Sequence, residues 1–315
     1  TLFGESTSYG TFSLYVIEVF ILFAFVFRGQ QQTQGFVLQI RKALCVFLAI
    51  GFFSLSFSPL TQVGWFQMIH AVSAALLFFL VTDERTNLKQ VLIVFLLGLL
   101  VPTMIGWFQV IHGSSPDSTV LGMAAKEVLT PGVAVVEIAS GRLMRAYGTF
   151  PHPNIFGGYL AFGVIALVWL SRSMKTHLWF MGLAAALLGA SLVITFSRSA
   201  WLGLCVGVLV FGVIMWRQKQ YLPKQTVSVV MIAGISITIA LAFFHQQVFS
   251  RLYPTDRVEV ISLEERAFQY QTVDDVFLSA PLFGVGPNAY TFALARLHPG
   301  QSVWSYQPIH NTFLL

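Results

Sequence analysis

Four places in the sequence put polar or basic side chains at the edges of long apolar runs, where such groups are costly unless they are hydrogen-bonded or used. They are the segment from Arg145 to Asn154, the triplet Ser197-Arg198-Ser199, Arg266, and the pair His310-Asn311. Arginine is permanently charged and presents a planar fork of donors to anions. Histidine, with an ordinary pKa of about 6.5, is the usual proton acceptor near neutral pH. The candidate chemistry is therefore anion binding and proton transfer.

Each place also has a purely structural interpretation. Pro151 and Pro153 fix an extended backbone ahead of a helix that Asn154 could cap, which would leave Arg145 as an interfacial residue. A lone arginine such as Arg198 can reach the membrane surface with its charge while its stem stays among apolar groups.

The other places leave the same choice open. Arg266 follows Glu265 and could form a surface ion pair, and His310 could be a hydrogen-bonded cap. Glu18 and His70 fall inside apolar runs, and a structural hydrogen bond is favoured over a role in a reaction. Asp274-Asp275 has no histidine or further carboxylate at ligand spacing, so neither a metal site nor a cofactor is expected.

Composition identifies the elements that must position these residues. The chain is 56% hydrophobic and only 10% charged, against roughly 25% charged in ordinary globular proteins. Thirty Phe against eighteen Lys and Arg leave too few polar side chains to cover a surface exposed to water. This excludes soluble enzymes and nucleic-acid-binding modules and predicts an integral membrane protein. The net charge of +5 then reflects loop positions and implies no nucleic-acid partner.

Apolar runs between charged breaks predict the membrane spans, because about 20 apolar residues cross a bilayer core. We expect an all-α, polytopic membrane bundle of about eight transmembrane helices, with a ninth starting near His310. The chain begins at Thr1 without a Met and stops at Leu315 within an apolar stretch, so we expect a fragment that lacks both ends of a longer protein. The eight expected spans are approximately residues 11–27, 43–58, 63–81, 90–111, 154–171, 178–196, 199–216 and 226–245.

The charge pattern predicts a turn and an orientation. Arg198 is the only ionisable residue between Leu178 and Trp216, and one helix over this length would extend about 58 Å, nearly twice the bilayer core. The chain must therefore turn in a tight hairpin at Arg198. On the opposite side ten basic residues mark the cytoplasm by the positive-inside rule. These are Arg28, Arg41, Lys42, Arg85, Lys89, Arg172, Lys175, Arg217, Lys219 and Lys224.

Two long loops, about residues 112–153 and 246–309, then lie outside with the Arg198 hairpin, so we expect the protein to act at its outer face. In the second loop, Ser262-x-x-Glu265 predicts the start of a helix that ends near Ser279.

One face of that helix carries Arg266, Tyr270, Val273 and Phe277, which predicts that Arg266 points toward the membrane domain. Asn288 is expected to cap a further short helix that ends near Leu297.

Taken in order, these motifs resemble the O-antigen ligase and O-antigen polymerase family. The resemblance covers about residues 142–315 of what we expect to be a single membrane-embedded ligase-like domain over residues 1–315. The first four spans match only in general hydrophobicity. The motifs are Arg145-x-x-Gly148-x-Phe150-x-His152-Pro153-Asn154, Thr195-Phe196-Ser197-Arg198, Arg266 ahead of Pro281-Leu282-Phe283-Gly284-Val285-Gly286, and His310-Asn311 before an apolar run.

The resemblance implies a multi-pass glycosyltransferase of the bacterial inner (plasma) membrane whose active face is periplasmic or extracellular. The donor would be a glycan on undecaprenyl diphosphate, and the acceptor a lipid-core sugar, a growing polysaccharide or a protein. By the same resemblance, His310 would accept the proton of the acceptor hydroxyl. Residues that would hold the diphosphate are Arg145, Arg198 and Arg266, and residues that would support the site are His152, Asn154, Ser197 and Asn311.

Guanidinium groups could stabilise a departing diphosphate without a metal, and one histidine suffices as general base. A direct displacement would invert the anomeric carbon. Two other classes compete with this interpretation. A transporter or flippase of lipid-linked saccharides would use polar groups within the spans, such as Glu18 and His70. A non-catalytic scaffold would use the external loops but gives no reason for three arginines and a histidine near one face.

Overall fold

The structure is a computed structural model that describes residues 16–29, 33–58, 61–130, 132–138, 141–174, 178–252, 257–300 and 306. By their internal contacts, residues group into two compact units. Unit 1 comprises Thr1–Leu88 and Ile261–Leu315, and unit 2 comprises Lys89–Val260.

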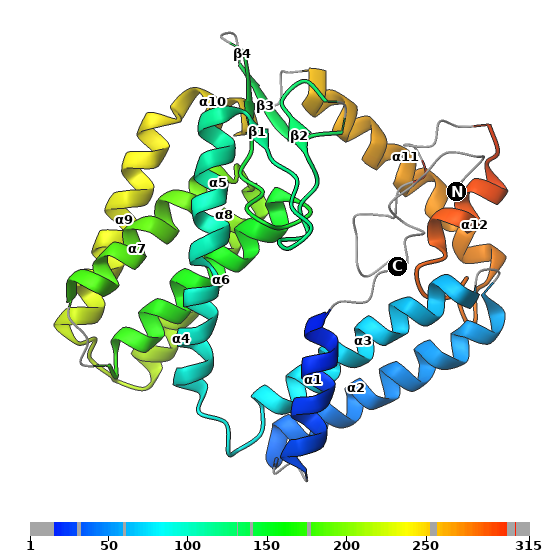
Figure 1. Ribbon diagram of the computed structural model, residues 1–315, viewed down its shortest axis with the longest axis horizontal. Helices are drawn as coiled ribbons and strands as arrows, with labels where there is room; N and C mark the ends of the chain where they lie inside the picture. Colours follow the sequence, from blue (N-terminus) through cyan, green and yellow to red (C-terminus); the bar gives the residue numbers. More distant parts are fainter. Residues whose placement is uncertain are drawn as a thin grey trace. The chain divides into compact units, whose positions relative to one another are not determined.

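Nearly all of the regular structure is helical (Figure 1). Within the described residues, six helices are long and apolar enough to cross a membrane, which confirms the prediction of an all-α polytopic bundle. The chain is therefore a multi-pass membrane protein. The six candidate spans are Gly35–Phe57, Thr61–Val81, Leu88–His112, Pro153–Ser171, Arg198–Arg217 and Lys224–Phe243.

Two further helices coincide with expected spans but are shorter. Helix α7 (Leu178–Ile194) is apolar throughout and, with 17 residues, extends about 26 Å, close to the bilayer core of about 30 Å. Helix α1 (Val16–Arg28) has 13 residues and covers the described part of the first expected span. The ninth helix expected near His310 lies outside the described residues.

The amino-terminal part of unit 1 consists of α1, α2 (Gly35–Ser54) with the 3-10 turn Leu55–Phe57, and α3 (Thr61–Val81), which packs against both other helices. Glu18 of α1 and His70 of α3 are hydrogen-bonded to each other, which agrees with the structural hydrogen bonds favoured for these residues, although the sequence analysis did not pair them. This bond accounts for the two polar side chains within the spans on which a transport function would depend.

The carboxyl end of α3 binds two of the residues that the charge count assigns to the cytoplasm. Arg41 is buried and donates to Thr82 Oγ1 from Nε at 3.1 Å and from Nη2 at 2.8 Å. Arg85 donates through Nε to Asp83 Oδ1 at 2.9 Å. Arg85 lies beyond the end of α3, as predicted for a residue of a connection, whereas Arg41 was expected before the second span and instead lies in the second turn of α2.

The carboxyl-terminal part of unit 1 holds α11 (Arg257–Ser279) and α12 (Tyr290–Leu297). The end of α11 matches the prediction, but its start does not, because Ser262 lies inside the helix rather than at its cap. Serine and glutamate three residues apart also fit a helix interior, so this pattern alone does not fix a helix start. Helix α12 ends at Leu297 as expected, but Ala289 precedes it as N-cap, while Asn288 has a left-handed φ of 58°.

The buried face of α11 also differs from the prediction. Gln269, Thr272 and Val276 are buried together with Val273, whereas Tyr270 and Phe277 are 52% and 62% exposed. The buried stripe is therefore rotated relative to the apolar stripe, because a few apolar residues on an otherwise largely polar helix do not determine which face is packed. The side chain of Arg266 lies outside the described part of α11.

Unit 2 contains α4 (Leu88–Gly98), α5 (Leu100–His112), α6 (Pro153–Ser171), α7, α8 (Arg198–Arg217), α9 (Lys224–Phe243) and α10 (His245–Leu252). Helix α6 packs against α7 and α8, and α7 lies along α9 (Figure 1). Glycine permits the close α7–α9 approach, because a Cβ at Gly189 would lie 2.5 Å from Ser236 Oγ. The central core includes Phe156, Leu160, Ala185 and Leu192.

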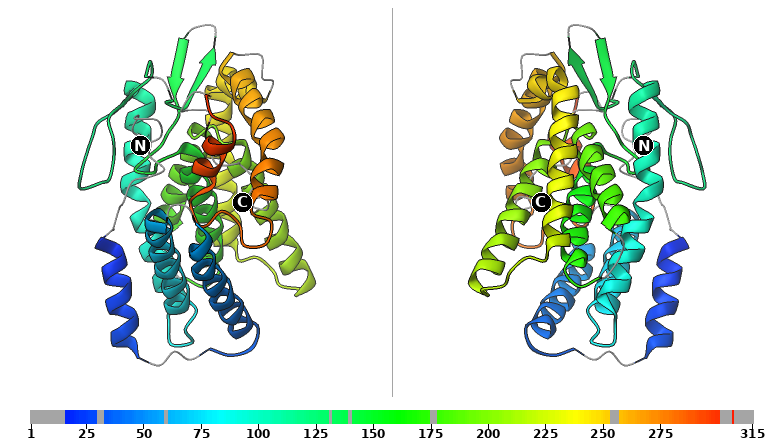
Figure 2. Two further views of the ribbon diagram at one scale, coloured as in Figure 1. Left: turned by 90° about the vertical axis from the view of Figure 1, so that its right-hand side faces the viewer. Right: turned by 90° about the vertical axis from the view of Figure 1, so that its left-hand side faces the viewer.

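The first expected external loop contains two small hairpins that the sequence analysis did not predict. Strands β1 (Ser114–Ser115) and β2 (Lys126–Glu127) pair in antiparallel fashion. Strands β3 (Val135–Ile138) and β4 (Gly141–Met144) also pair, with Val135 opposite Met144. Figure 2 shows β3 and β4 as two arrows beyond the ends of the helices of unit 2. Strand β4 delivers the chain to Arg145.

Candidate functional site

The turn between α7 and α8 confirms the predicted hairpin at Arg198. Helix α7 ends at Ile194 and α8 begins at Arg198, with Ser197 as N-cap accepting from Ala200 N at 3.4 Å. Phe196 has a φ of 48°, a left-handed conformation that a bulky residue rarely adopts. Its ring is fully buried and packs edge-on against Phe244. We refer to Thr195–Arg198 as the arginine turn.

Arg145 binds this turn from the end of β4. It is 5% exposed, and its Nε donates to the Thr195 carbonyl oxygen at 2.8 Å. Its Nη2 donates to Asn154 Oδ1 at 2.6 Å. The neighbouring Ala146 N donates to Ile194 O at 3.0 Å. These contacts connect the hairpin segment, the start of α6 and the arginine turn.

Arg198 and Arg251 bind each other's backbone segments. Arg198 Nη1 donates to the carbonyl oxygen of Arg251 at 2.8 Å, and Arg251 Nε donates to the carbonyl oxygen of Phe196 at 3.4 Å. Arg251 lies in the last turn of α10, and the adjacent Ser250 donates to Glu137 O of β3 at 3.0 Å. The sequence analysis did not select Arg251, because it counted only as one of several charges in a long loop.

Two guanidinium groups, those of Arg145 and Arg251, thus donate to carbonyl oxygens of this short turn, and the turn itself carries a third, that of Arg198. The turn leads into the amino terminus of α8, and Arg145 also binds Asn154 in the first turn of α6. Helix amino termini carry partial positive charge and point backbone N–H groups outward, which favours bound anions. The combination of arginine charges and two helix amino termini is suited to a negatively charged group.

The start of α6 corrects one prediction. His152, and not Asn154, is the N-cap: its Nδ1 accepts from Asn154 N at 3.1 Å, and Pro153 occupies the first turn. The Asn154 side chain instead accepts from Arg145. Of the residues predicted to support the site, His152 therefore fixes the helix start, Asn154 orients Arg145, and Ser197 caps α8.

The loop after Arg145 is held by Gln109 of α5, a buried side chain that the sequence analysis missed. Its Oε1 accepts from Tyr147 N and Gly148 N, both at 2.9 Å. Its Nε2 donates to Gly148 O at 2.9 Å and to Ser115 Oγ at 3.0 Å. Gln109 is a polar residue within an apolar run. The same signal identified Glu18 and His70 and could have identified Gln109.

Tyr147 provides a second anchor. Its hydroxyl oxygen accepts from Ala134 N at 2.6 Å, which ties the loop to the segment before β3. Burial raises the pKa of this phenol, although the hydrogen bond from Ala134 and the charge of Arg145 act in the opposite direction. The neutral phenol is therefore the form that the fold favours.

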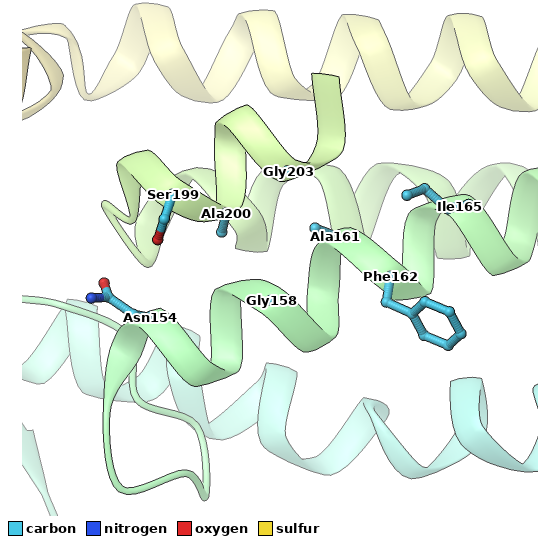
Figure 3. A pocket seen from close by; sticks show the side chains of 8 residues that line it. All are labelled: Asn154, Gly158, Ala161, Phe162, Ile165, Ser199, Ala200 and Gly203. Carbon is cyan, nitrogen blue, oxygen red and sulfur yellow. The ribbon is translucent and has the colours of Figure 1, made fainter. Parts of the chain in front are cut away.

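A groove begins beside the arginine turn. It lies between α6 and α8 and has a volume of about 300 Å³. Asn154 and Ser199 point toward one another at one end, and the groove continues past small residues toward Ile165 (Figure 3). Its lining consists of Asn154, Gly158, Ala161, Phe162, Ile165, Ser199, Ala200 and Gly203.

The remaining predicted site residues are less well described. Arg266 lies in α11 of unit 1, with its side chain outside the described part of the structure. His310 and Asn311 lie outside the described residues. Of the predicted set, Arg145, His152, Asn154, Ser197 and Arg198 are thus the members that the structure brings together, all in unit 2.

The fold and this site define a multi-pass helical membrane protein with an arginine-lined turn at the amino termini of two of its helices. Residues 183–315 match the family model described as O-antigen ligase, which confirms the resemblance indicated by the motifs. The match includes Arg198, Arg251, Arg266 and His310, whereas Arg145 precedes it. No curated protein and no solved structure matches the chain. The family match indicates a membrane enzyme that ligates or polymerises glycans.

Proposed function

We propose that this protein is a metal-independent glycosyltransferase that moves a glycan from a polyprenyl diphosphate, such as undecaprenyl diphosphate, to an acceptor hydroxyl. The acceptor is a lipid-core sugar, a growing polysaccharide or a protein. The observation that carries the proposal is the arginine turn, which places Arg198 at the amino terminus of α8 and accepts a hydrogen bond from Arg145, whose guanidinium also binds Asn154 at the start of α6. The O-antigen ligase match over residues 183–315 supports it.

The arginines act on the leaving group. As the bond between the anomeric carbon and the diphosphate oxygen breaks, negative charge grows on that oxygen. Arg145, Arg198 and Arg266 hold the diphosphate, and Arg145, which is buried and oriented by Asn154, supplies its charge at close range. Preorganised charges in a site of low dielectric constant stabilise such a transition state effectively.

His310 acts on the acceptor. The acceptor oxygen attacks the anomeric carbon, the electron pair of the broken bond leaves with the diphosphate, and the hydroxyl proton passes to the imidazole of His310. No covalent enzyme intermediate forms, so the anomeric configuration inverts. A product with retained configuration would contradict this step.

The charge count supports a location for the reaction. By that count, the arginine turn and the start of α6 are assigned to the side of the membrane opposite the ten basic residues assigned to the cytoplasm. In a bacterial inner (plasma) membrane the reaction then takes place at the periplasmic or extracellular face, where lipid-linked donors and envelope acceptors meet.

The test is transfer by the full-length protein in lipid bilayers, with an undecaprenyl-diphosphate oligosaccharide, with and without EDTA, and with lipid, glycan and peptide acceptors. We expect transfer that survives EDTA, is lost in His310→Ala and persists in the control variant His112→Ala. His112 stacks on Phe108 at the end of α5, and its Nδ1 lies 3.1 Å from the Phe108 carbonyl oxygen. Absence of transfer to every acceptor by a folded protein would favour a transporter of lipid-linked saccharides instead.

A further inference from the structure

The groove between α6 and α8 is bounded by two close contacts between the helices. A Cβ at Gly157 would lie 2.9 Å from Ala200 Cβ, and a Cβ at Gly207 would lie 2.3 Å from Ile165 Cδ1. Gly157 is needed for this packing, whereas at Gly207 the flexible end of the Ile165 side chain could shift to make room. Gly158 and Gly203 are different, because a Cβ at either position would meet no atom within 4 Å. Gly158 and Gly203 keep the groove open, although the packing of α6 against α8 does not require glycine at either position (Figure 3).

The groove is amphipathic along its length. Asn154 and Ser199 form its polar end, and the walls beyond are apolar. From Asn154 to Ile165 the helix rises about 17 Å, more than half of a bilayer core of about 30 Å. A second hollow of about 460 Å³ between α4 and α6 shares Asn154, Gly158 and Phe162 with it.

The polar end adjoins the arginine turn. Asn154 accepts from Arg145, and Ser199 follows Arg198 in the first turn of α8. The groove therefore offers positive charge at its outer end and an apolar channel that descends between membrane-spanning helices. This is complementary to an amphiphile with an anionic headgroup and one long apolar chain.

We propose that the α6–α8 groove binds the proximal part of the isoprenoid chain of the donor lipid and so aligns its diphosphate with the arginine turn. This inference rests on the proposed function, since the donor is the lipid whose headgroup the arginines would hold. An isoprenoid chain bears regularly spaced methyl branches. Neighbouring small residues, Gly158 and Ala161 opposite Ala200 and Gly203, leave room for a branched chain between the helices.

The test fills the groove without disturbing the fold. Gly203→Leu narrows only the α6–α8 groove, and Gly158→Leu narrows both hollows. Both positions have free space, and leucine has a higher helix propensity than glycine, so the variants should fold. Gly212→Leu is the matched control, because it lies on the same helix with equally free space but outside the groove.

The readout is photo-crosslinking of the full chain in nanodiscs with a photoreactive undecaprenyl diphosphate that carries no sugar. We expect both groove variants to lower crosslinking about tenfold, which corresponds to about 1.4 kcal/mol, with Gly212→Leu unchanged. Crosslinking at the parental level in both variants would overturn the proposal. So would equal labelling of the groove by a photoreactive phospholipid that the isoprenoid does not displace, since the groove would then hold bulk lipid.

Because crosslinking requires no transfer, the two proposals can fail separately. If the parental protein transfers no glycan but the groove variants lose crosslinking, lipid binding by the groove is supported and the proposed enzyme function is refuted. If both groove variants transfer glycan and crosslink at the parental level, the enzyme function is retained and the lipid-binding role of the groove is refuted.

Discussion

Gln109→Leu offers the sharpest test of how the fold positions Arg145. Gln109 is fully buried, and its amide makes four hydrogen bonds, three of them with Tyr147 and Gly148 just after Arg145. Leucine keeps a similar volume but removes all four bonds and leaves their partners without the amide. At a net value of about 1 kcal/mol per bond, the expected loss in the free energy of unfolding is about 4 kcal/mol.

Thermal unfolding of the protein in detergent measures this loss. At about 2–4 °C per kcal/mol for a protein of this size, the midpoint should fall by about 8–16 °C. Transfer measured well below the new midpoint should also be reduced, because the segment that carries Arg145 loses its anchor on α5.

Thr103→Val is the matched control on the same helix. Thr103 is also fully buried, but its hydroxyl has no hydrogen-bond partner among the described residues. Replacing it with an apolar group of the same shape should leave stability unchanged or slightly raised. The reasoning is refuted if Gln109→Leu unfolds at the parental temperature, or if the two variants lose the same stability.

Three further variants test the arginine turn and its support. Arg198→Lys should lower the initial rate of transfer by at least about tenfold, because a point charge does not replace a planar fork; near-parental turnover would argue against a phosphate contact. Arg251→Leu removes the donor to Phe196 O and should lower both transfer and the unfolding midpoint, with partial rescue by Arg251→Lys, whereas a loss of stability alone would indicate a purely structural role. The raised pKa of Tyr147 means that the folded state favours the neutral phenol, so its contribution to stability is present below the ordinary pKa of 10 and is lost as pH rises through the higher folded-state pKa. Tyr147→Phe should therefore flatten the decline in unfolding midpoint as the pH rises above about 10, and an unchanged decline would assign it to other groups.

Local sequence patterns predicted the spans and the hairpin at Arg198, because apolar length and isolated charge determine both. They did not predict the cap of α6. His152 and Asn154 can both accept a backbone N–H, and the choice depends on Arg145, which occupies Asn154 Oδ1 after the chain has folded back from β4. Arg251 was missed for the same reason, since its partner Phe196 is 55 residues away.

The stripe on α11 failed for a different physical reason. The apolar stripe of α11 rested on a few apolar residues of a helix that is otherwise largely polar, and such a stripe does not determine which face the rest of the fold buries. In this chain, polar residues that interrupt apolar runs were the better guide to buried positions. Gln109, Glu18 and His70 all take part in hydrogen bonds.

The left-handed backbone at Phe196 couples the geometry of the site to its charge. Such a conformation costs about 1–2 kcal/mol for a residue with a Cβ, and the buried ring and the hydrogen bonds at the flanking carbonyl groups hold it in place. It directs the carbonyl oxygens of Thr195 and Phe196 to Arg145 and Arg251. A neutral carbonyl group orients a guanidinium and leaves its positive charge uncompensated, whereas a carboxylate would neutralise that charge. One strained residue therefore sets the direction of two arginines and starts the helix that carries the third, which is why the turn, and not any single arginine, is the unit on which the proposed chemistry depends.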